Sequence, residues 1–162
     1  MTDKLEFKLI KPSSKGEIWA EDEGRNLRAV EIYINNRELV DILREIEKPF
    51  AEEEGHPNLA GGYGHNIPQI LYKDFTEALI PETYSQLYGV ELLCCKDCGV
   101  PGCWSPKAKI RQDEEFVYWE DFCQNHRKNW VYNLSYKFAK AEYEAEMEKL
   151  KSFAEEYGSS VF

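Results

Sequence analysis

All five cysteines and one of the three histidines of this 162-residue chain lie between Cys94 and Arg127. The segment begins with CCKDCGVPGCW and ends with FCQNHR. Its glycines allow the backbone to turn tightly between the thiols. Thiolates and imidazoles are the side chains with which proteins hold zinc, usually in tetrahedral sets of four. The pattern therefore predicts a glycine-rich hairpin that meets a distant imidazole in the fold.

The spacing of these residues favours one particular set of ligands. Cys95 and Cys98 are separated by two residues, as in a zinc knuckle, where a tight turn points both sulfurs at one ion. Four protein ligands leave no position for water, so such an ion would be a structural staple and not a catalyst. The predicted ligands, with Cys123 or Cys94 as substitutes, are Cys95, Cys98, Cys103 and His126.

Three other interpretations of the cysteines stay open. The thiols could be reduced and bind no metal, because a cytosolic chain keeps its thiols reduced. A redox role, including a Cys98–Cys103 disulfide, is disfavoured because a redox CxxC opens a helix, and the glycines and proline of the hairpin oppose one. A catalytic zinc would need three ligands and a base such as Glu120 or Asp121.

The other two histidines, His56 and His65, lie in the irregular segment 51–70, whose GGYG run surrounds Tyr63. No clear strand precedes this run and no helix clearly follows it, so it is a poor phosphate cradle. We expect a long flexible loop with solvated histidines. The alternative is a small enzyme in which a histidine and carboxylates share a pocket with Tyr63 and Trp104.

Arg127 is expected to pair with a nearby carboxylate, Asp121 or Glu120. Trp104, Trp119 and Trp130 are expected in the core, because large aromatic side chains bury much apolar area.

The composition limits the classes of function. The net charge is −10 and the sequence pI is about 4.9, which disfavours binding to the phosphate backbone of nucleic acids. No apolar stretch has the length of a membrane span or a signal peptide, so we expect a cytoplasmic protein without a membrane partner.

The hydrophobic pattern predicts an α+β fold over residues 1–162 as a single domain. Alternating residues indicate strands at 4–11, 17–21, 27–34, 89–95, 107–112, 115–122 and 130–138. Helical spacing indicates one helix that Asn35 or Asn36 caps and that Pro49 ends or kinks. A second helix is indicated over 139–157. The predicted architecture is an antiparallel meander sheet of about five to seven strands with these two main helices packed on it.

Two motifs in the second half resemble a family of uncharacterised bacterial proteins. They are CGxxGCW, at Cys98–Trp104, and VxWxxFxxxHR, at Val117–Arg127. The chain departs from that pattern at Ser105 and Asn125, where proline is expected. The resemblance implies no activity, but it singles out as motif positions Cys98, Cys103, Trp104, His126 and Arg127.

The sequence therefore favours a non-catalytic binding module, with a structural zinc as its expected cofactor and a protein or small molecule as its partner. The alternatives are the small enzyme and an acidic inhibitor or immunity-type protein that covers a basic surface.

Overall fold

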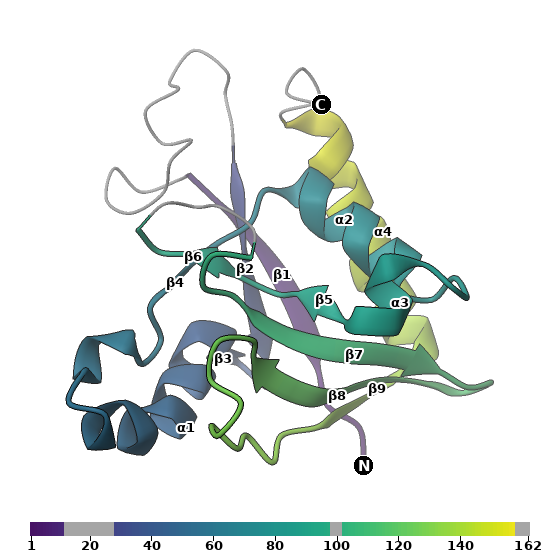
Figure 1. Cartoon of the computed structure of the whole chain (residues 1–162). Coiled ribbons are helices and arrows are strands. Elements are labelled where there is room, and N and C mark those ends of the chain that lie inside the picture. The colour runs from purple at the N-terminus through teal and green to yellow at the C-terminus, as the bar shows by residue number, and fades with distance from the viewer. Residues whose placement is uncertain (12–27, 98–101, 158–162) are drawn as a thin grey trace.

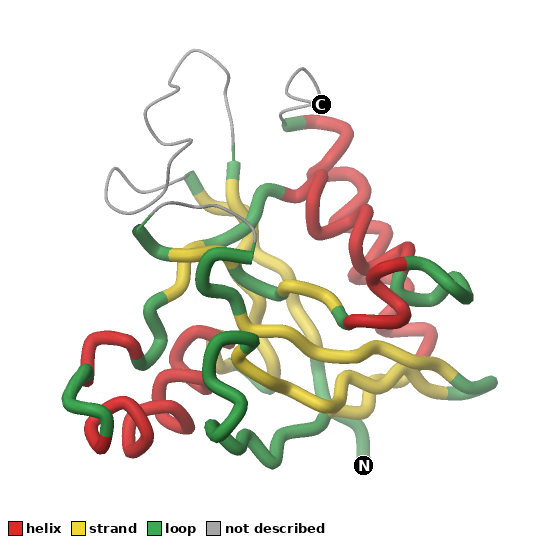
Figure 2. The backbone as a smooth tube through the Cα atoms, in the orientation of Figure 1, coloured by secondary structure: helices red, strands yellow, loops and turns green. Residues whose placement is uncertain are grey.

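The computed structural model describes residues 1–11, 28–97 and 102–157. Within these residues the chain is α+β, as predicted, and every strand pair is antiparallel. The strands do not form one meander of five to seven strands. They divide between sheets of three, two and four strands, and the helices lie around them (Figures 1 and 2).

The first sheet is formed by β1 (Leu5–Ile10), β2 (Ala29–Ile34) and β3 (Arg37–Glu38). The alternation predicted for the first two strands is confirmed, with Phe7 and Ile32 paired and both fully buried. Asn35 and Asn36 do not cap a helix. They form the β2–β3 turn with φ of 52° and 67°, a left-handed conformation that asparagine tolerates and that tight hairpins require.

The first helix, α1 (Leu39–Glu53), begins later and ends later than predicted. Its N-cap is Glu38, and Pro49 lies inside the helix instead of ending it. Proline removes one helical hydrogen bond, but burial of Leu43 and Ala51 on either side of it holds this helix together. The apolar face of α1 packs on β2 and β3.

The segment predicted as a long loop contains short regular elements. They are a 3₁₀ turn, η3 (Pro57–Leu59), the strand β4 (Tyr63–Gly64), and the helix α2 (Pro68–Glu77), which begins with a proline at its first position. The short helix α3 (Tyr84–Tyr88) follows. Neither α2 nor α3 was predicted, because their apolar residues match neither the helical nor the strand period over a full window.

The strand predicted at 89–95 is split between two sheets. Its first part is β5 (Val90–Glu91), at the edge of the four-stranded sheet, and its second part is β6 (Cys94–Cys95), which pairs with β4. The short strand predicted at 17–21 lies outside the described residues.

The four-stranded sheet continues with β7 (Pro106–Gln112), β8 (Phe116–Gln124) and β9 (Tyr136–Ala139). Lys107, predicted to face solvent, is buried, because the β7–β8 register shifts between Lys107 and Lys109. A bulge of this kind moves a side chain out of strict alternation. The strand predicted at 130–138 forms only in its last residues.

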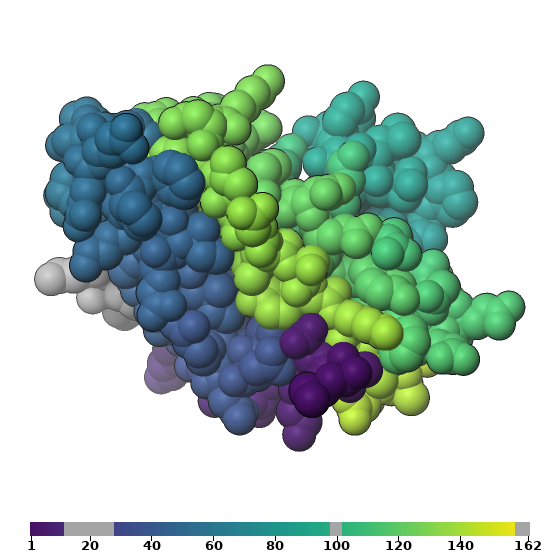
Figure 3. Space-filling model, turned by 90° about the horizontal axis from the view of Figure 1, so that it is seen from below, coloured from purple at the N-terminus to yellow at the C-terminus, as the bar shows by residue number. Residues whose placement is uncertain are grey.

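The last helix, α4 (Lys140–Glu156), agrees with the prediction to within one residue at each end. It lies beside α2 and contacts β1, β8 and β9, with Tyr143 and Leu150 buried (Figure 1). Figure 3, which shows the molecule from below, has the purple first residues beside the yellow-green segment that enters β9. There Asp3 bonds to the backbone of Lys137, which joins two of the sheets.

Among the described helices, none has both the length and the apolar character needed to cross a membrane.

Candidate functional site

The imidazole of His126 lies beside Gly102, the residue at which the described part of the predicted hairpin resumes. His126 Nε2 is 2.9 Å from the carbonyl oxygen of Gly102, the residue before Cys103. The ring is stacked on Trp104, with centroids 6.1 Å apart and planes 8° apart. A carbonyl oxygen can only accept, so Nε2 is the donor of this hydrogen bond, and in the neutral ring the lone pair is then on Nδ1. Nδ1 is therefore the nitrogen that could bind a metal.

The predicted cysteine ligands are distributed differently. Cys95 is buried on β6, Cys103 is exposed, and Cys98 lies outside the described residues. Cys95, Cys103 and His126 do not gather within 4.8 Å of one another, the separation that defines the one three-ligand group found in the described part of the chain. The four-ligand zinc set stays a prediction.

The two substitute ligands differ in exposure: Cys94 is buried on β6, and Cys123 is an exposed residue of β8 whose thiol is partly covered. The Cys94 thiol is buried and lies 3.6 Å from the carbonyl oxygen of His65. Burial raises the pKa of the Cys123 thiol, which disfavours the thiolate form that binds zinc.

Arg127 pairs with a carboxylate, but not with either of the predicted ones. Its Nε donates to Glu54 Oε1 at 2.8 Å, and the indole of Trp130 donates to the other oxygen at 2.6 Å. These bonds, that of Arg127 first, lower the pKa of Glu54. Glu120 instead pairs with Arg111. Glu54 therefore ties the end of α1 to the segment after β8, a structural role.

Glu47 is a fully buried carboxylate that the sequence pattern did not single out. Its Oε1 accepts from the Gly61 N–H at 2.8 Å, and its Oε2 accepts from the hydroxyls of Tyr63 and Tyr132, both at 2.5 Å. Burial raises the pKa of Glu47, and the three hydrogen bonds oppose that rise. This cluster, saturated by its own partners, fixes the GGYG segment against α1 and explains why that segment is ordered.

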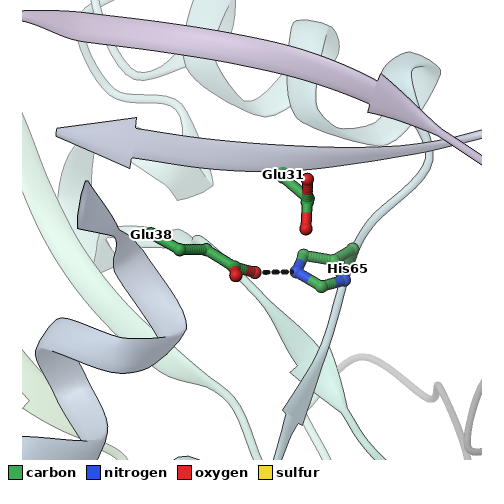
Figure 4. A group of neighbouring side chains, drawn as sticks. All are labelled: Glu31, Glu38 and His65. Atoms are coloured by element: carbon green, nitrogen blue, oxygen red, sulfur yellow. Dashed lines mark hydrogen bonds and ion pairs between the residues drawn. The ribbon is translucent and has the colours of Figure 1, made fainter. Parts of the chain in front are cut away.

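A second group of titratable side chains is more open. Glu31 comes from β2, Glu38 from the β3–α1 junction, and His65 directly follows β4; their side chains point toward one another (Figure 4). His65 Nε2 lies 2.6 Å from Glu38 Oε1, and the two side chains are 16% and 20% exposed. The expectation of a solvated His65 is therefore wrong. His65 lies far from both carboxylates in the sequence, so no local pattern announces this group.

The histidines do not share a hollow with one another. His56 is exposed at the start of η3, while His65 and His126 belong to the separate groups described above. The hollow beside Glu38 has a volume of about 500 Å³, and its lining contains no histidine. It is lined by Tyr33, Asn36, Arg37, Glu38, Asp41, Arg44 and Glu45.

A cluster of exposed apolar side chains covers α3 and the turn before it. We call it the α3 surface: Ile80, Tyr84, Leu87 and Tyr88, which are 48%, 66%, 49% and 60% exposed. The described chain has only two other exposed large hydrophobic residues, Met1 and Val131. Spacings of three and four residues place Tyr84, Leu87 and Tyr88 on one face of the helix.

The chain matches no family model, no curated protein and no solved structure. What this protein does is therefore inferred from the geometry above, and the resemblance to a bacterial family stays an expectation.

Proposed function

We propose that this chain is a non-catalytic interaction module that binds a basic protein through the α3 surface. The observation that carries the proposal is the gathering of four of the six exposed large hydrophobic side chains of the described chain within residues 80–88. Contiguous exposed apolar residues mark interaction sites, and tyrosine is enriched where partners bind.

The α3 surface is held in place before any partner arrives. The Thr83 side chain caps the helix, accepting from the Gln86 N–H at 3.2 Å and donating to the Glu77 carbonyl at 2.6 Å. The rings of Tyr84 and Tyr88 contact each other with centroids 4.9 Å apart. Ordered side chains lose less entropy on binding, so this arrangement favours affinity.

The partner is proposed to be basic because several carboxyl groups lie near the α3 surface, where the cation in contact with its rings is Lys107, 5.5 Å from the centroid of Tyr84. The pKa of Asp74 on α2 is raised to about 6, mainly by burial; the charge of Lys73 opposes the rise and the charges of Glu77 and Glu91 add to it. Glu82 adds an exposed carboxyl next to Tyr84. With a net charge of −10, the chain would attract a basic surface and repel a second copy of itself. An inhibitor or immunity-type role is the special case in which the covered surface is the partner's active site.

The structural zinc belongs to the same proposal as a staple for the hairpin. The contact between His126 and Gly102 supports it, since the only distant ligand in the predicted set already lies against the hairpin. The enzyme alternative rests on one contact, the 2.6 Å pair of His65 and Glu38, which has the geometry of an oriented base.

Site-specific photo-crosslinking tests the proposal. A benzophenone side chain is introduced at Leu87, and a control is introduced at Val131, which is equally exposed but isolated. We expect a discrete adduct with a basic protein from position 87 only. The captured protein, once purified, should bind the wild type in a salt-sensitive manner and bind the Tyr84→Ser, Tyr88→Ser double variant at least about tenfold more weakly.

Two results would count against this function. One is an adduct with a second copy of the chain, which would make the α3 surface a homodimer contact. The other is an adduct partner whose affinity is unchanged by the tyrosine substitutions or by salt.

A further inference from the structure

We propose that Glu31, Glu38 and His65 bind a divalent transition-metal ion through two carboxylate oxygens and one imidazole nitrogen. This site is separate from the predicted zinc staple and from the α3 surface. Imidazole and carboxylate together suit ions such as Zn²⁺, Co²⁺ and Mn²⁺, whereas the thiol hairpin selects softer or zinc-like ions.

The three ligand atoms are already close to a coordinating arrangement. They all lie within 4.8 Å of one another. Ligands of a tetrahedral zinc ion, at about 2.0 to 2.2 Å from the metal, are about 3.4 Å apart. Side-chain rotations that move the ligand atoms by about 1 Å would therefore bring them to the required separation. In the absence of an ion, the Glu38–His65 hydrogen bond occupies the centre of the group (Figure 4).

The backbone holds the ligands in register. Glu38 lies opposite Tyr33 in the β2–β3 pair, two residues from Glu31. On the other side, the carbonyl of Asn66 accepts from the Val30 N–H at 2.9 Å, which fixes the segment after β4 beside β2. Each ligand is therefore anchored within one residue of an interstrand or intersegment bond. Metal sites need this pre-organisation, because loose ligands lose affinity to side-chain entropy.

Charge also favours a cation. Two half-buried carboxylates and one imidazole lie within 4.8 Å of one another. The positive charge of Lys8, which lies opposite Glu31 on β1, partly offsets their negative charge. A dication would remove the repulsion between the carboxylates, with more effect than in water because the site is partly shielded from solvent.

An ion would have a route in and a supporting contact. Glu38 also lines the hollow of about 500 Å³, so the site opens toward solvent. The hydroxyl of Tyr33 donates to Glu31 Oε1 at 3.4 Å, a contact of the kind that orients a metal ligand from outside the coordination sphere. Three protein ligands would leave a coordination position for water or for a bound anion.

Titration of the 162-residue protein with CoCl₂, followed by visible absorption, separates this site from the hairpin. Cobalt bound by oxygen and nitrogen has ligand-field bands without the strong sulfur-to-metal charge-transfer band of a thiolate site. We expect one such ion per chain, bound about 100-fold more weakly by Glu31→Gln and His65→Gln and about tenfold more weakly by Tyr33→Phe. His126→Gln, which removes the imidazole of the predicted zinc set, should leave this component unchanged.

A second measurement needs no variant. Mn²⁺, which thiolates bind poorly, should broaden the ring proton resonances of His65 in the wild-type protein at lower metal concentration and more strongly than those of His56 and His126. The proposal is overturned if no thiolate-free cobalt component binds at millimolar metal. It is equally overturned if that component survives His65→Gln, or if manganese broadens the His126 ring in place of the His65 ring.

Discussion

Glu47 and Tyr132, which are 85 residues apart in the sequence, are joined by a buried hydrogen bond of 2.5 Å. The same carboxylate oxygen accepts from Tyr63, whose hydroxyl also accepts from the Gln124 side-chain amide at 3.2 Å. These three hydrogen bonds together link α1, the GGYG segment, β8 and the segment after β8. His65 directly follows the GGYG segment and His126 lies two residues after Gln124, so the network fixes the backbone beside both histidines.

Replacing Tyr132 by phenylalanine should destabilise the protein by about 1 to 3 kcal/mol, because a buried carboxylate loses one of its three donors. The free energy of unfolding in urea measures this loss. Tyr84→Phe is the matched control: its ring is exposed, so its hydroxyl can bond to water and the substitution should have little effect. Equal stabilities of Tyr132→Phe and wild type would show that the bond contributes nothing net.

Asp74 and Asp113 should change stability with pH in opposite directions. The pKa of Asp74 in the fold is about 6, above its ordinary value of 3.8, because burial disfavours its charge. The folded state binds this proton more tightly than the unfolded state does. The contribution of Asp74 to the free energy of unfolding therefore falls as the pH rises from about 4 to about 6. Asp74→Asn should therefore gain stability over wild type at pH 7 and lose that advantage below pH 4.

The turn between β7 and β8 provides the contrast. Asp113 accepts from the Tyr118 hydroxyl and from the N–H groups of Glu115 and Phe116, and these bonds lower its pKa to about 2. The contribution of Asp113 to the stability of the fold is present above pH 4 and is lost as the pH falls toward 2. Asp113→Ala should be less stable than wild type at pH 7, with the difference shrinking in acid. Unfolding curves at several pH values test both signs.

Gly89, between α3 and β5, should tolerate no side chain. Its φ is +95°, and a Cβ there would lie 2.9 Å from the backbone oxygen of Ala108. Gly89→Ala should cost about 3 kcal/mol, since neither the backbone angle nor the neighbouring strand can adjust. Gly55, with φ of +77° and nothing within 4 Å, is the control and should cost about 1 kcal/mol from backbone strain alone.

The zinc staple predicts that untagged protein, purified without chelator, carries one zinc ion that protects hairpin thiols from alkylation. Cys103→Ser and His126→Gln should each lose the ion and lower the thermal midpoint, because structural zinc contributes to folding directly. Elemental analysis together with a thiol count measures both effects. Protein without zinc and with fully reactive hairpin thiols would remove the staple and leave the α3 surface proposal intact.

The sequence by itself determined the elements whose hydrophobic period is regular and long. Alternation located β1 and β2, and the spacing of Tyr143, Met147 and Leu150 located α4. The sequence also predicted that His126 would return toward the thiols, and the antiparallel β7–β8 pair does bring its ring to Gly102. These are outcomes of local pattern and short connections, which a linear sequence contains.

Only the tertiary structure decided which distant side chains became partners. Glu47 with Tyr132, Glu54 with Arg127, and the Glu31, Glu38 and His65 group all join residues that no local period relates. The division into three sheets likewise depends on the pairing of β4 with β6 and of β5 with β7. A side chain's neighbours across the core follow from packing the whole chain at once, and this is why the candidate metal group emerged only from the folded molecule.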